Sequence, residues 1–542
     1  MKMKIIRKIV IFSCFIISGS SCSEDFLTKS DPSSVSVEDF YETERDFMMA
    51  LAGTYNVLLR GDYNNMSFWK YHETVSDDAH PGDDPEFVSL QGYDLDNFTV
   101  RPDNLVPLNI FASSYIGIAR SNITMTRALS SDLNEGFVNQ IVAETRFLRA
   151  LFYFNLVRCF GDVPLIMKEV TDPDLVAVPR TDKNKIYDEL IIPDLQYAID
   201  ILPAIRSGDN LARATSGAAR ALLAKVYLTR GEEDKSNYQK ARDMALEVIN
   251  SNTYSLEENY EDIFKRENEF GQEMIFEINH ISGQEGYERE GFGQGNSQPK
   301  RNGLGSFYNN AFAPRFKGPA RVGDSLGLFS FGGWGLVVPT TSNDPRDSMF
   351  NVPEGTGLVE AFEEGDLRKD VTILNYYEAA AEKGVPVDRS ISPYNANKYD
   401  DWEESENGEA DDNYIILRLA DIYLMYAEAE NEINGGPTPE ALEYLNKVRR
   451  RAYGYNIEEP SVVDYGNLDY KEFLDAVYKE RRLELAYEGH RWFDLIRRPQ
   501  RAIKVMKAHG KTGITTNKLV LPIPQYIIDE SEGLITQNEG YY

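Results

Sequence analysis

The sequence predicts a mainly α-helical chain in which helix pairs stack into a superhelix, interrupted by one long, loop-rich segment. Three observations support this fold. Apolar side chains recur at helical spacing in several long blocks. Short turns that contain glycine or aspartate separate neighbouring blocks. Between about residues 280 and 415, glycine, asparagine and proline are frequent and no helical period is sustained.

The helical blocks divide into two groups on either side of this irregular segment. In the first block Phe47, Leu51, Tyr55 and Leu58 share one face. The blocks cover residues 44–60, 108–130, 136–160, 184–203, 214–230 and 236–251, then 415–434, 437–453 and 469–497. We therefore expect a single domain over residues 38–542. Its helical scaffold covers about 38–280 and 415–542, and an irregular insertion at about 280–415 faces a ligand.

Two helix pairs have the residue spacing of tetratricopeptide units. In the first pair, Ala224, Tyr227 and Gly231 match the first helix, whereas Tyr238 and Ala241 match the second. Small residues at these sites let antiparallel helices approach closely, and the aromatic rings fill the adjoining gaps. The helix at 420–432 and the residues after it repeat the pattern. A tetratricopeptide-like helical-pair superhelix is therefore the predicted architecture.

The N-terminus has the features of a bacterial lipoprotein signal peptide. Basic residues precede an apolar run of about ten residues, which is too short to span a bilayer. Small residues at 18–21 lead directly to Cys22, the expected site of cleavage and lipidation. We expect a signal peptide over residues 1–21 and a flexible polar tether over 22–37. A soluble secreted protein cleaved nearby is the alternative, and both place the protein outside the cytoplasm.

The charge of the chain excludes some classes of binding partner, and its cysteine content excludes a disulfide framework. The chain has 57 Lys and Arg against 87 Asp and Glu, a net charge of −30. This charge repels nucleic acid and anionic membrane surfaces, so we expect no nucleic-acid partner and membrane attachment only through the lipid. With Cys22 lipidated and Cys14 in the signal peptide, Cys159 is the one thiol left, which excludes a disulfide framework.

Four sequence blocks resemble the SusD/RagB family of outer-membrane nutrient-binding lipoproteins. They cover residues 143–165, 417–449, 480–495 and 521–541. The first carries Glu144, Arg146 and Arg149, and the third runs from Glu480 to the segment around Trp492. Glu539 departs from the family pattern, where proline is usual, but it lies in a tail.

This resemblance implies a SusD-like fold and a partner. Such proteins cap a SusC-like TonB-dependent β-barrel transporter as a hinged lid, and they capture oligosaccharides or, in some members, peptides. Residues 23–25 resemble the acidic export signal that sends these lipoproteins to the outer face. The implied location is the outer membrane, lipid-anchored and facing the cell surface.

The third block also contains charged groups that could indicate acid–base catalysis or a metal. Glu480, Glu484 and Glu488 lie on one line of a predicted helix beside arginines, which favours ion pairing at i,i+4. We therefore predict a structural charge network, with His490 in packing and hydrogen bonding and Trp492 in the core. The same interpretation applies to Glu144 and to Arg146, Arg149 and Arg158.

An acidic cluster at residues 77–84 is the one candidate cation site. Its carboxylates could hold calcium, although the spacing of an EF-hand loop is missing. The alternatives are a solvated loop, or carboxylates that accept hydrogen bonds from ligand hydroxyls. The last interpretation draws on Trp69 and Tyr71, which lie just upstream of Asp77 and Asp78. Calcium is possible, and no other cofactor is expected.

Sugar binding without catalysis needs exposed aromatic faces and planar polar groups. Three tryptophans are predicted in loops, and the glycines beside Trp334 would let its ring project. The predicted ligand-binding residues are Trp69, Tyr71, Asp77, Asp78, Tyr287, Tyr308, Arg321, Phe331, Trp334 and Trp402.

No nucleophile elbow, zinc motif or phosphate-binding glycine loop occurs in the sequence. We therefore expect a non-catalytic protein that binds oligosaccharides or polysaccharides and delivers them to the transporter. A peptide-binding member of the same family is the alternative. A secreted glycosidase is a third hypothesis, because that chemistry needs only two suitably placed carboxylates.

Overall fold

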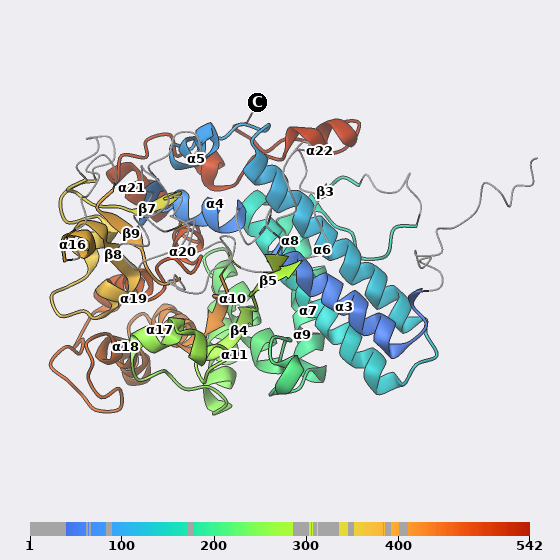
Figure 1. Ribbon diagram of the computed structural model, residues 1–542, viewed down its shortest axis with the longest axis horizontal. Helices are drawn as coiled ribbons and strands as arrows, with labels where there is room; N and C mark the ends of the chain where they lie inside the picture. The colour runs from blue at the N-terminus through green and yellow to red at the C-terminus, as the bar shows by residue number, and fades with distance from the viewer. Residues whose placement is uncertain are drawn as a thin grey trace, which may run out of the picture.

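The computed structural model describes most of the helical scaffold and parts of the insertion. Figure 1 shows its elements. The described residues are 40–60, 63, 67–82, 89–171, 178–285, 303–304, 306, 312, 335–344, 352–382, 384, 392–399 and 410–541. The predicted signal peptide, Cys22 and the tether lie outside these ranges.

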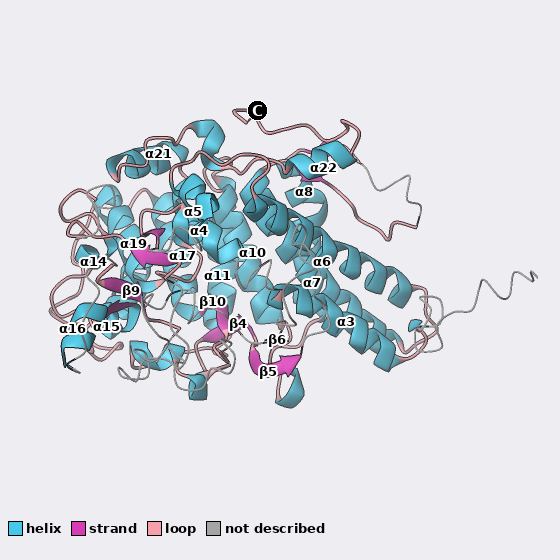
Figure 2. Cartoon of the chain, turned by 45° about the horizontal axis from the view of Figure 1, so that its top comes forward, coloured by secondary structure: helices cyan, strands magenta, loops and turns pink. Residues whose placement is uncertain are grey.

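Three long helices pack side by side at one end of the molecule (Figures 1 and 2). They are α3 (Glu44–Leu59), α6 (Leu105–Leu129) and α7 (Glu135–Phe160). The side chains of Thr43, Asn104 and Asn134 cap their first turns. A Cβ added at Gly117 of α6 would lie 2.3 Å from the Phe152 ring, so glycine permits the close approach to α7. The three predicted helical blocks are confirmed.

A second group of helices continues the stack. It comprises α8 (Lys183–Ile186), the π-helical turn η4 (Tyr187–Ile191), α9 (Ile192–Ile201), α10 (Ser216–Arg230) and α11 (Ser236–Asn250). Helices α10 and α11 form the first predicted tetratricopeptide-like pair. A Cβ at Gly231 would lie 2.4 Å from the Tyr238 ring, so the small residue and the aromatic meet as the sequence pattern predicts.

The stack continues across the insertion. Helix α17 (Leu419–Asn434) packs on both α11 and α18 (Pro439–Ala452). Gly435 ends α17 in the left-handed conformation, with φ of 67°. The predicted helix at 415–434 is wrong at its start, because strand β10 (Tyr414–Arg418) pairs there with β4 (Met274–Ile278).

The predicted helix at 469–497 is two helices. Helix α19 (Tyr470–Glu484) ends before a sharp turn, and α20 (Arg491–Ile496) follows it. Within the turn Tyr487 and Gly489 have φ of 64° and 78°. A Cβ at Gly489 would lie 2.7 Å from the Tyr414 hydroxyl, so this turn has room only for glycine at that position. Helices α21 (Pro499–Ala508) and α22 (Gln525–Glu530) follow.

The described parts of the insertion form short elements. Helices α14 (Leu358–Ala361), α15 (Arg368–Thr372) and α16 (Tyr376–Glu382) have seven residues or fewer.

Besides β4 with β10, the two-stranded antiparallel sheets of the described chain pair β1 (Ala79–Pro81) with β7 (Val337–Pro339), β2 (Val163–Pro164) with β3 (Arg180–Thr181), β5 (Ile281–Glu285) with β6 (Gly303–Leu304), and β8 (Ile373–Asn375) with β9 (Tyr394–Ala396). Helices α4 (Trp69–Thr74) and α5 (Ser89–Asp96) contact β1. Elsewhere in the chain, 3₁₀ turns occur at Gly208–Asn210, Tyr260–Phe264, Arg266–Asn268 and Thr516–Leu519.

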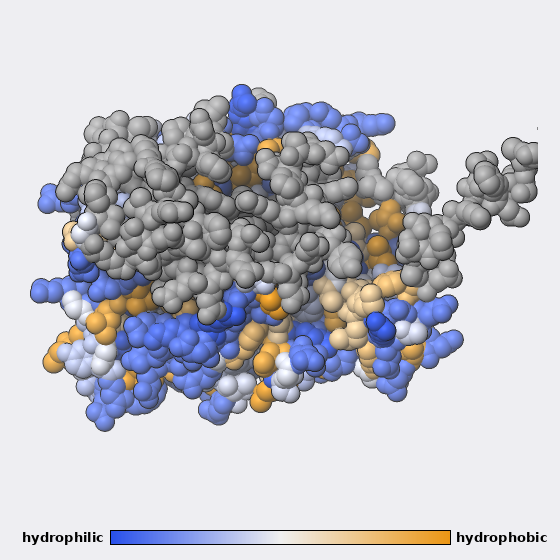
Figure 3. Space-filling model, in the orientation of Figure 1, coloured by the Kyte–Doolittle hydropathy of each residue, from blue (hydrophilic) through white to orange (hydrophobic). Residues whose placement is uncertain are grey.

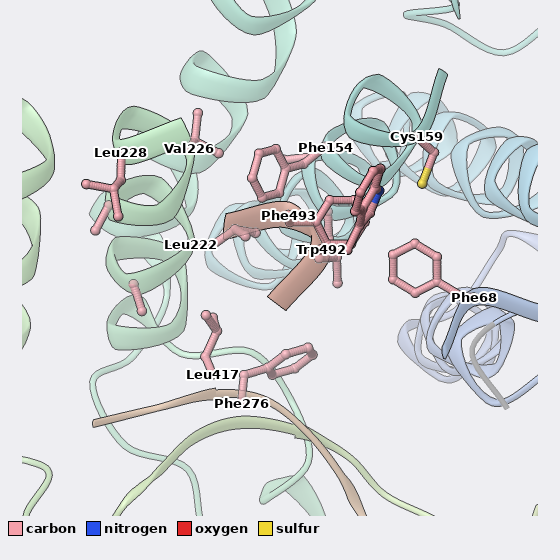
Figure 4. Packing of buried hydrophobic residues seen from close by; sticks show 14 of the residues in the cluster. Phe68, Phe154, Cys159, Leu222, Val226, Leu228, Phe276, Leu417, Trp492 and Phe493 are labelled. Atoms are coloured by element: carbon pink, nitrogen blue, oxygen red, sulfur yellow. The ribbon is translucent and has the colours of Figure 1, made fainter. Parts of the chain in front are cut away.

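One large hydrophobic core joins the scaffold to the C-terminal helices. Figure 4 shows Phe154 and Cys159 of α7 near Trp492 and Phe493 of α20. Trp492 is buried, as predicted, and Cys159 is a buried free thiol. Close packing of this kind stabilises a chain that the cysteine count leaves without disulfides.

The described surface is largely hydrophilic on one face of the molecule (Figure 3). On the face seen in Figure 3, hydrophilic residues cover much of the described surface, with smaller hydrophobic patches between them. Within the described ranges, every helix is too short or too polar to cross a bilayer.

Candidate functional site: the base of the insertion and a groove on the scaffold

The segment from α4 to β1 joins the scaffold to the insertion and carries four of the predicted site residues. Strand β1 pairs antiparallel with β7, with Ala79 opposite Pro339. The Thr340 hydroxyl donates to the Asp77 carbonyl at 2.8 Å. The N-terminal part of the chain therefore forms one wall at the base of the insertion.

Trp69 and Tyr71 lie in helix α4 and are only 1% and 2% exposed. The ring of Trp69 packs 5.0 Å from that of Phe312 in the insertion. The Trp492 Nε1–H donates to the Tyr71 hydroxyl at 2.8 Å. The predicted placement of Trp69 in an exposed loop is wrong, because α20 and the insertion cover α4, and Tyr71, which was predicted to bind ligand, is buried with it. As placed here, both rings stabilise the fold and offer no face for a sugar.

Asp77 and Asp78 are buried and paired with arginines. Arg491 donates to both carboxylate oxygens of Asp77 at 2.7 Å through Nε and Nη2. Arg482 Nε donates to Asp78 at 2.5 Å. Although burial raises it, the pKa of Asp77 is held well below its usual range by Arg491 and Arg482. The predicted acidic solvated loop is therefore wrong at these two positions, and neither carboxylate is open to a ligand hydroxyl.

The described residues provide no group of side chains that could bind a calcium ion. Among them, no group of three or more histidine, cysteine, aspartate or glutamate side chains could hold a metal ion. The arginines occupy Asp77 and Asp78, while Asp83 and Asp84 lie outside the described residues.

The other predicted ligand-binding residues fall in parts of the insertion outside the described ranges. They are Tyr287, Tyr308, Arg321, Phe331, Trp334 and Trp402. Their contact with a ligand stays a prediction.

The three glutamates of the third sequence block lie in a buried charge network, as predicted. Their partners, however, come from other elements rather than from i,i+4 positions. Arg418 of β10 contacts Glu484 at 2.5 Å and Glu488 at 2.7 Å. Further pairs join Arg368 to Glu480, Arg451 to Glu484, Arg449 to Glu480 and Lys398 to Glu488. We call these eight residues, with Glu273 and Asp366, the charge network.

The charge network binds the insertion to the scaffold. Arg368 comes from α15 and Lys398 follows β9, both within the insertion, whereas Glu484 ends scaffold helix α19. Although burial raises it, the pKa of Glu484 is lowered to about 2 by Arg451, Arg418 and Arg368. Glu484 is therefore ionised at neutral pH, and its buried ion pairs give it a structural role.

His490 also has a packing role, as predicted. Its Nδ1 lies 3.1 Å from the Lys225 ammonium. Burial and the nearby Lys225 charge lower the pKa of His490 to about 3, so the imidazole is neutral at pH 7. Arg149 likewise donates to both oxygens of Asp194, at 2.8 and 2.9 Å.

An open groove lies between the segment that follows α9, the helices α10 and α11, and strand β4. Figure 1 labels these four elements. It consists of two adjoining clefts of about 220 and 280 Å³ that share Ala204, Thr253 and Tyr254. Arg206, Arg213, Phe270 and Glu277 line the first cleft and Arg220 lines the second. We call this the scaffold groove.

Sequence reasoning missed the scaffold groove. Tyr254 and Phe270 are lone aromatics in connections between elements, and neither has the glycine-flanked pattern that singled out Trp334. One local signal existed, since Gly271 follows Phe270 and marks a turn.

Comparison with known proteins gives two family matches and many similar structures. A family model described as the SusD family matches residues 261–541. A second, described as "Starch-binding associating with outer membrane", matches residues 25–228. Together they cover most of the scaffold on both sides of the insertion, except residues 229–260 with helix α11.

Individual relatives agree with these matches over nearly the whole chain. SusD-like protein P25 of Formosa agariphila is 30% identical over 506 residues, which cover 91% of this chain and 90% of the relative. A solved laminarin binding SusD-like protein is 29% identical, with a TM-score of 0.71, covering 92% of this chain and 100% of that one. Surface glycan-binding protein A from Bacteroides thetaiotaomicron, solved with laminarihexaose, shares the fold at 23% identity, a TM-score of 0.72, and coverage of 91% and 99%.

The predicted mainly helical, tetratricopeptide-like fold is thus confirmed, with an insertion held on a charge network. The match to the SusD family model covers just over half of the chain. The Formosa agariphila relative extends the likeness to nine-tenths of it. On these grounds, the chain belongs to the SusD family.

Proposed function

We propose that this protein binds glycans at the cell surface, without catalysis, and delivers them to a SusC-like TonB-dependent transporter. The observation that carries the proposal is the 29% identity to a laminarin binding SusD-like protein whose whole length this chain covers. A lipid on Cys22 anchors the protein in the outer membrane. The buried charge network supports the proposal, because it fixes the base of the insertion on a rigid scaffold.

The ligand contacts are assigned to the insertion. The proposed residues are Tyr287, Tyr308, Arg321, Phe331, Trp334 and Trp402. Aromatic rings pack on the apolar face of a pyranose, and the guanidinium donates to its hydroxyls.

Replacing Trp334 with alanine should weaken laminarin binding about tenfold, because one stacking face is worth about 1–2 kcal/mol. Isothermal titration calorimetry on the purified protein measures the loss. Tyr526→Ala is the control, since Tyr526 is a half-exposed aromatic on scaffold helix α22, and it should leave the affinity unchanged.

Unchanged affinity in both Trp334→Ala and Trp402→Ala would remove these tryptophans from the site. Binding of a peptide pool without binding of any glycan would favour the peptide-binding alternative. Hydrolysis of the bound glycan by the purified protein would favour the glycosidase hypothesis.

Replacing Cys22 with alanine should abolish lipid attachment, because the thiol is the acylated group. The variant should leave the membrane fraction and incorporate no radiolabelled fatty acid in cells. Cys159→Ala is the matched control and should stay in the membrane fraction. A Cys22→Ala protein that still carries lipid would contradict the assignment.

Co-purification of the lipidated protein with a β-barrel transporter tests delivery.

A further inference from the structure

We propose that the scaffold groove is a second glycan site, which binds an oligosaccharide bearing carboxylate or sulfate groups. In this proposal an acidic group of the oligosaccharide lies beside Arg206, and its sugar rings lie against Phe270 and Tyr254. The inference rests on the proposed function for the saccharide nature of the ligand, whereas its charge and place come from the groove itself. The groove lies on the helical scaffold, and every residue named here as lining it is outside the loops assigned to the first site.

The first cleft of the scaffold groove carries positive charge on a strongly acidic protein, whereas in the second cleft Glu247 pairs with Arg220 at 2.9 Å. Glu144 is fully buried and accepts hydrogen bonds from two guanidiniums, Arg206 Nη2 at 2.8 Å and Arg213 Nε at 2.9 Å. Two cations therefore share one carboxylate. Burial raises the pKa of Glu277 to about 8, so its carboxyl group is mainly protonated at pH 7 and does not cancel the excess. On a chain of net charge −30, this is an attractive place for an anion.

Arg206 has hydrogen-bonding capacity left for a ligand. Its Nε donates to the Ala214 carbonyl at 3.2 Å and its Nη2 to Glu144. Within the described chain, Nη1 has no hydrogen-bond partner, and the residue lines the open cleft. An anionic group of a sugar can accept from this nitrogen, while Glu144 fixes the guanidinium in place.

Phe270 is held in a conformation that bulky residues rarely adopt. Its φ is 54°, in the left-handed region where glycine is favoured. Its N–H donates to the Glu277 carboxyl group, which stabilises the turn. Phe270 is one of the residues that line the groove. Glycine would adopt this backbone conformation with less strain than phenylalanine does. The presence of phenylalanine therefore indicates that its ring has a function.

The second aromatic extends the surface. Tyr254 lines both clefts, and its hydroxyl lies 3.4 Å from the Thr215 hydroxyl. Ile205, which is 70% exposed, forms part of the rim with Leu211. Two clefts joined at one aromatic residue suit a chain of several sugar rings, with apolar faces on the side chains and acidic groups towards Arg206.

Phe270→Gly separates binding from stability. Glycine relieves the backbone strain while removing the ring, so the melting temperature should stay the same or rise. The affinity for tetragalacturonate, or for a sulfated tetrasaccharide, should fall about tenfold. Glu532→Gly is the matched control, because Glu532 also has positive φ, at 52°, and does not line the groove. It should leave binding unchanged.

Arg206→Gln tests the charge. It should weaken binding of the two charged probes about tenfold, and leave the affinity for laminarin, the neutral probe, unchanged. The uronate and sulfate probes distinguish the two sources of negative charge, and binding of either one supports the proposal.

The outcomes separate the two proposals. Laminarin binding without binding of either charged probe would overturn the groove proposal and leave the first site standing. Charged-probe binding that survives both Phe270→Gly and Arg206→Gln would also overturn the groove proposal. Failure to bind laminarin or any other glycan, together with binding of an acidic peptide, would overturn both.

Discussion

Replacing Arg418 with methionine should lower the free energy of unfolding by about 4 kcal/mol, or prevent folding. The Arg418 guanidinium is 1% exposed and contacts Glu273, Glu484 and Glu488 at 2.9, 2.5 and 2.7 Å. Methionine keeps the apolar stem but leaves buried carboxylates short of a partner, which typically costs 3–5 kcal/mol. Urea unfolding of the purified protein, followed by circular dichroism, measures the change.

Arg101→Met is the control for this prediction. Arg101 pairs with Asp103 at 3.0 Å, but both side chains are more than 60% exposed. Exposed pairs contribute about 0–1 kcal/mol, so this variant should unfold almost as the wild type does. A loss below about 1 kcal/mol for Arg418→Met would mean that the charge network does not hold the insertion on the scaffold.

Replacing Glu277 with glutamine should stabilise the protein by about 3 kcal/mol at pH 7. Burial raises the pKa of Glu277 to about 8, and the nearby charge of Glu269 adds a smaller increase. Hydrogen bonds from Phe270 and Asn413 lower this pKa but do not offset the burial. Glu277 also lines a second, small cleft, which it shares with Lys265, Lys398 and Asp412. The folded protein therefore keeps this carboxyl group protonated at a pH where the unfolded chain has ionised it.

The sign of this effect depends on pH. Below about pH 4.5 the group is protonated in both states, so wild type and Glu277→Gln should differ little. As pH rises from 4.5 to 8, the unfolded carboxyl ionises and the wild type loses stability relative to the variant. Thermal unfolding at pH 4, 5.5, 7 and 8 gives the profile.

Glu258→Gln is the control for Glu277→Gln, since Glu258 is exposed, and the change should stay within about 0.5 kcal/mol throughout. A Glu277→Gln variant less stable than the wild type at pH 7 would contradict a protonated, desolvated Glu277.

Helical periodicity predicted the scaffold well, because each amphipathic block carries its own evidence. The turn between α19 and α20 could not be predicted in this way. A side chain at Gly489 of this turn would collide with Tyr414 and His72, which are far away in sequence and become neighbours only in the fold. Similarly, the glutamates of α19 were recognised as structural, but their cations on β10 and α15 become neighbours only in the fold.

Burial was the main source of error at the site. Trp69 has the sequence features of an exposed loop tryptophan, and only the packing of Phe312 and α20 shows that α4 is covered. The arginines that pair with Asp77 and Asp78 lie some 400 residues away. At Phe270 the sequence signals only a turn, through Gly271, and the left-handed backbone becomes visible only in the fold, where the Phe270 N–H donates to Glu277.

The pairing of β4 with β10 has a consequence for how such proteins diversify. Ile278 and Tyr414 are direct partners in this sheet, so the long segment between them leaves and re-enters the scaffold at neighbouring points. Its ends stay fixed whatever its length, and the entropic cost of a longer loop grows only slowly. A change in the length of this segment therefore need not displace β4 and β10, so the helical stack can keep its packing while the loops of the insertion vary.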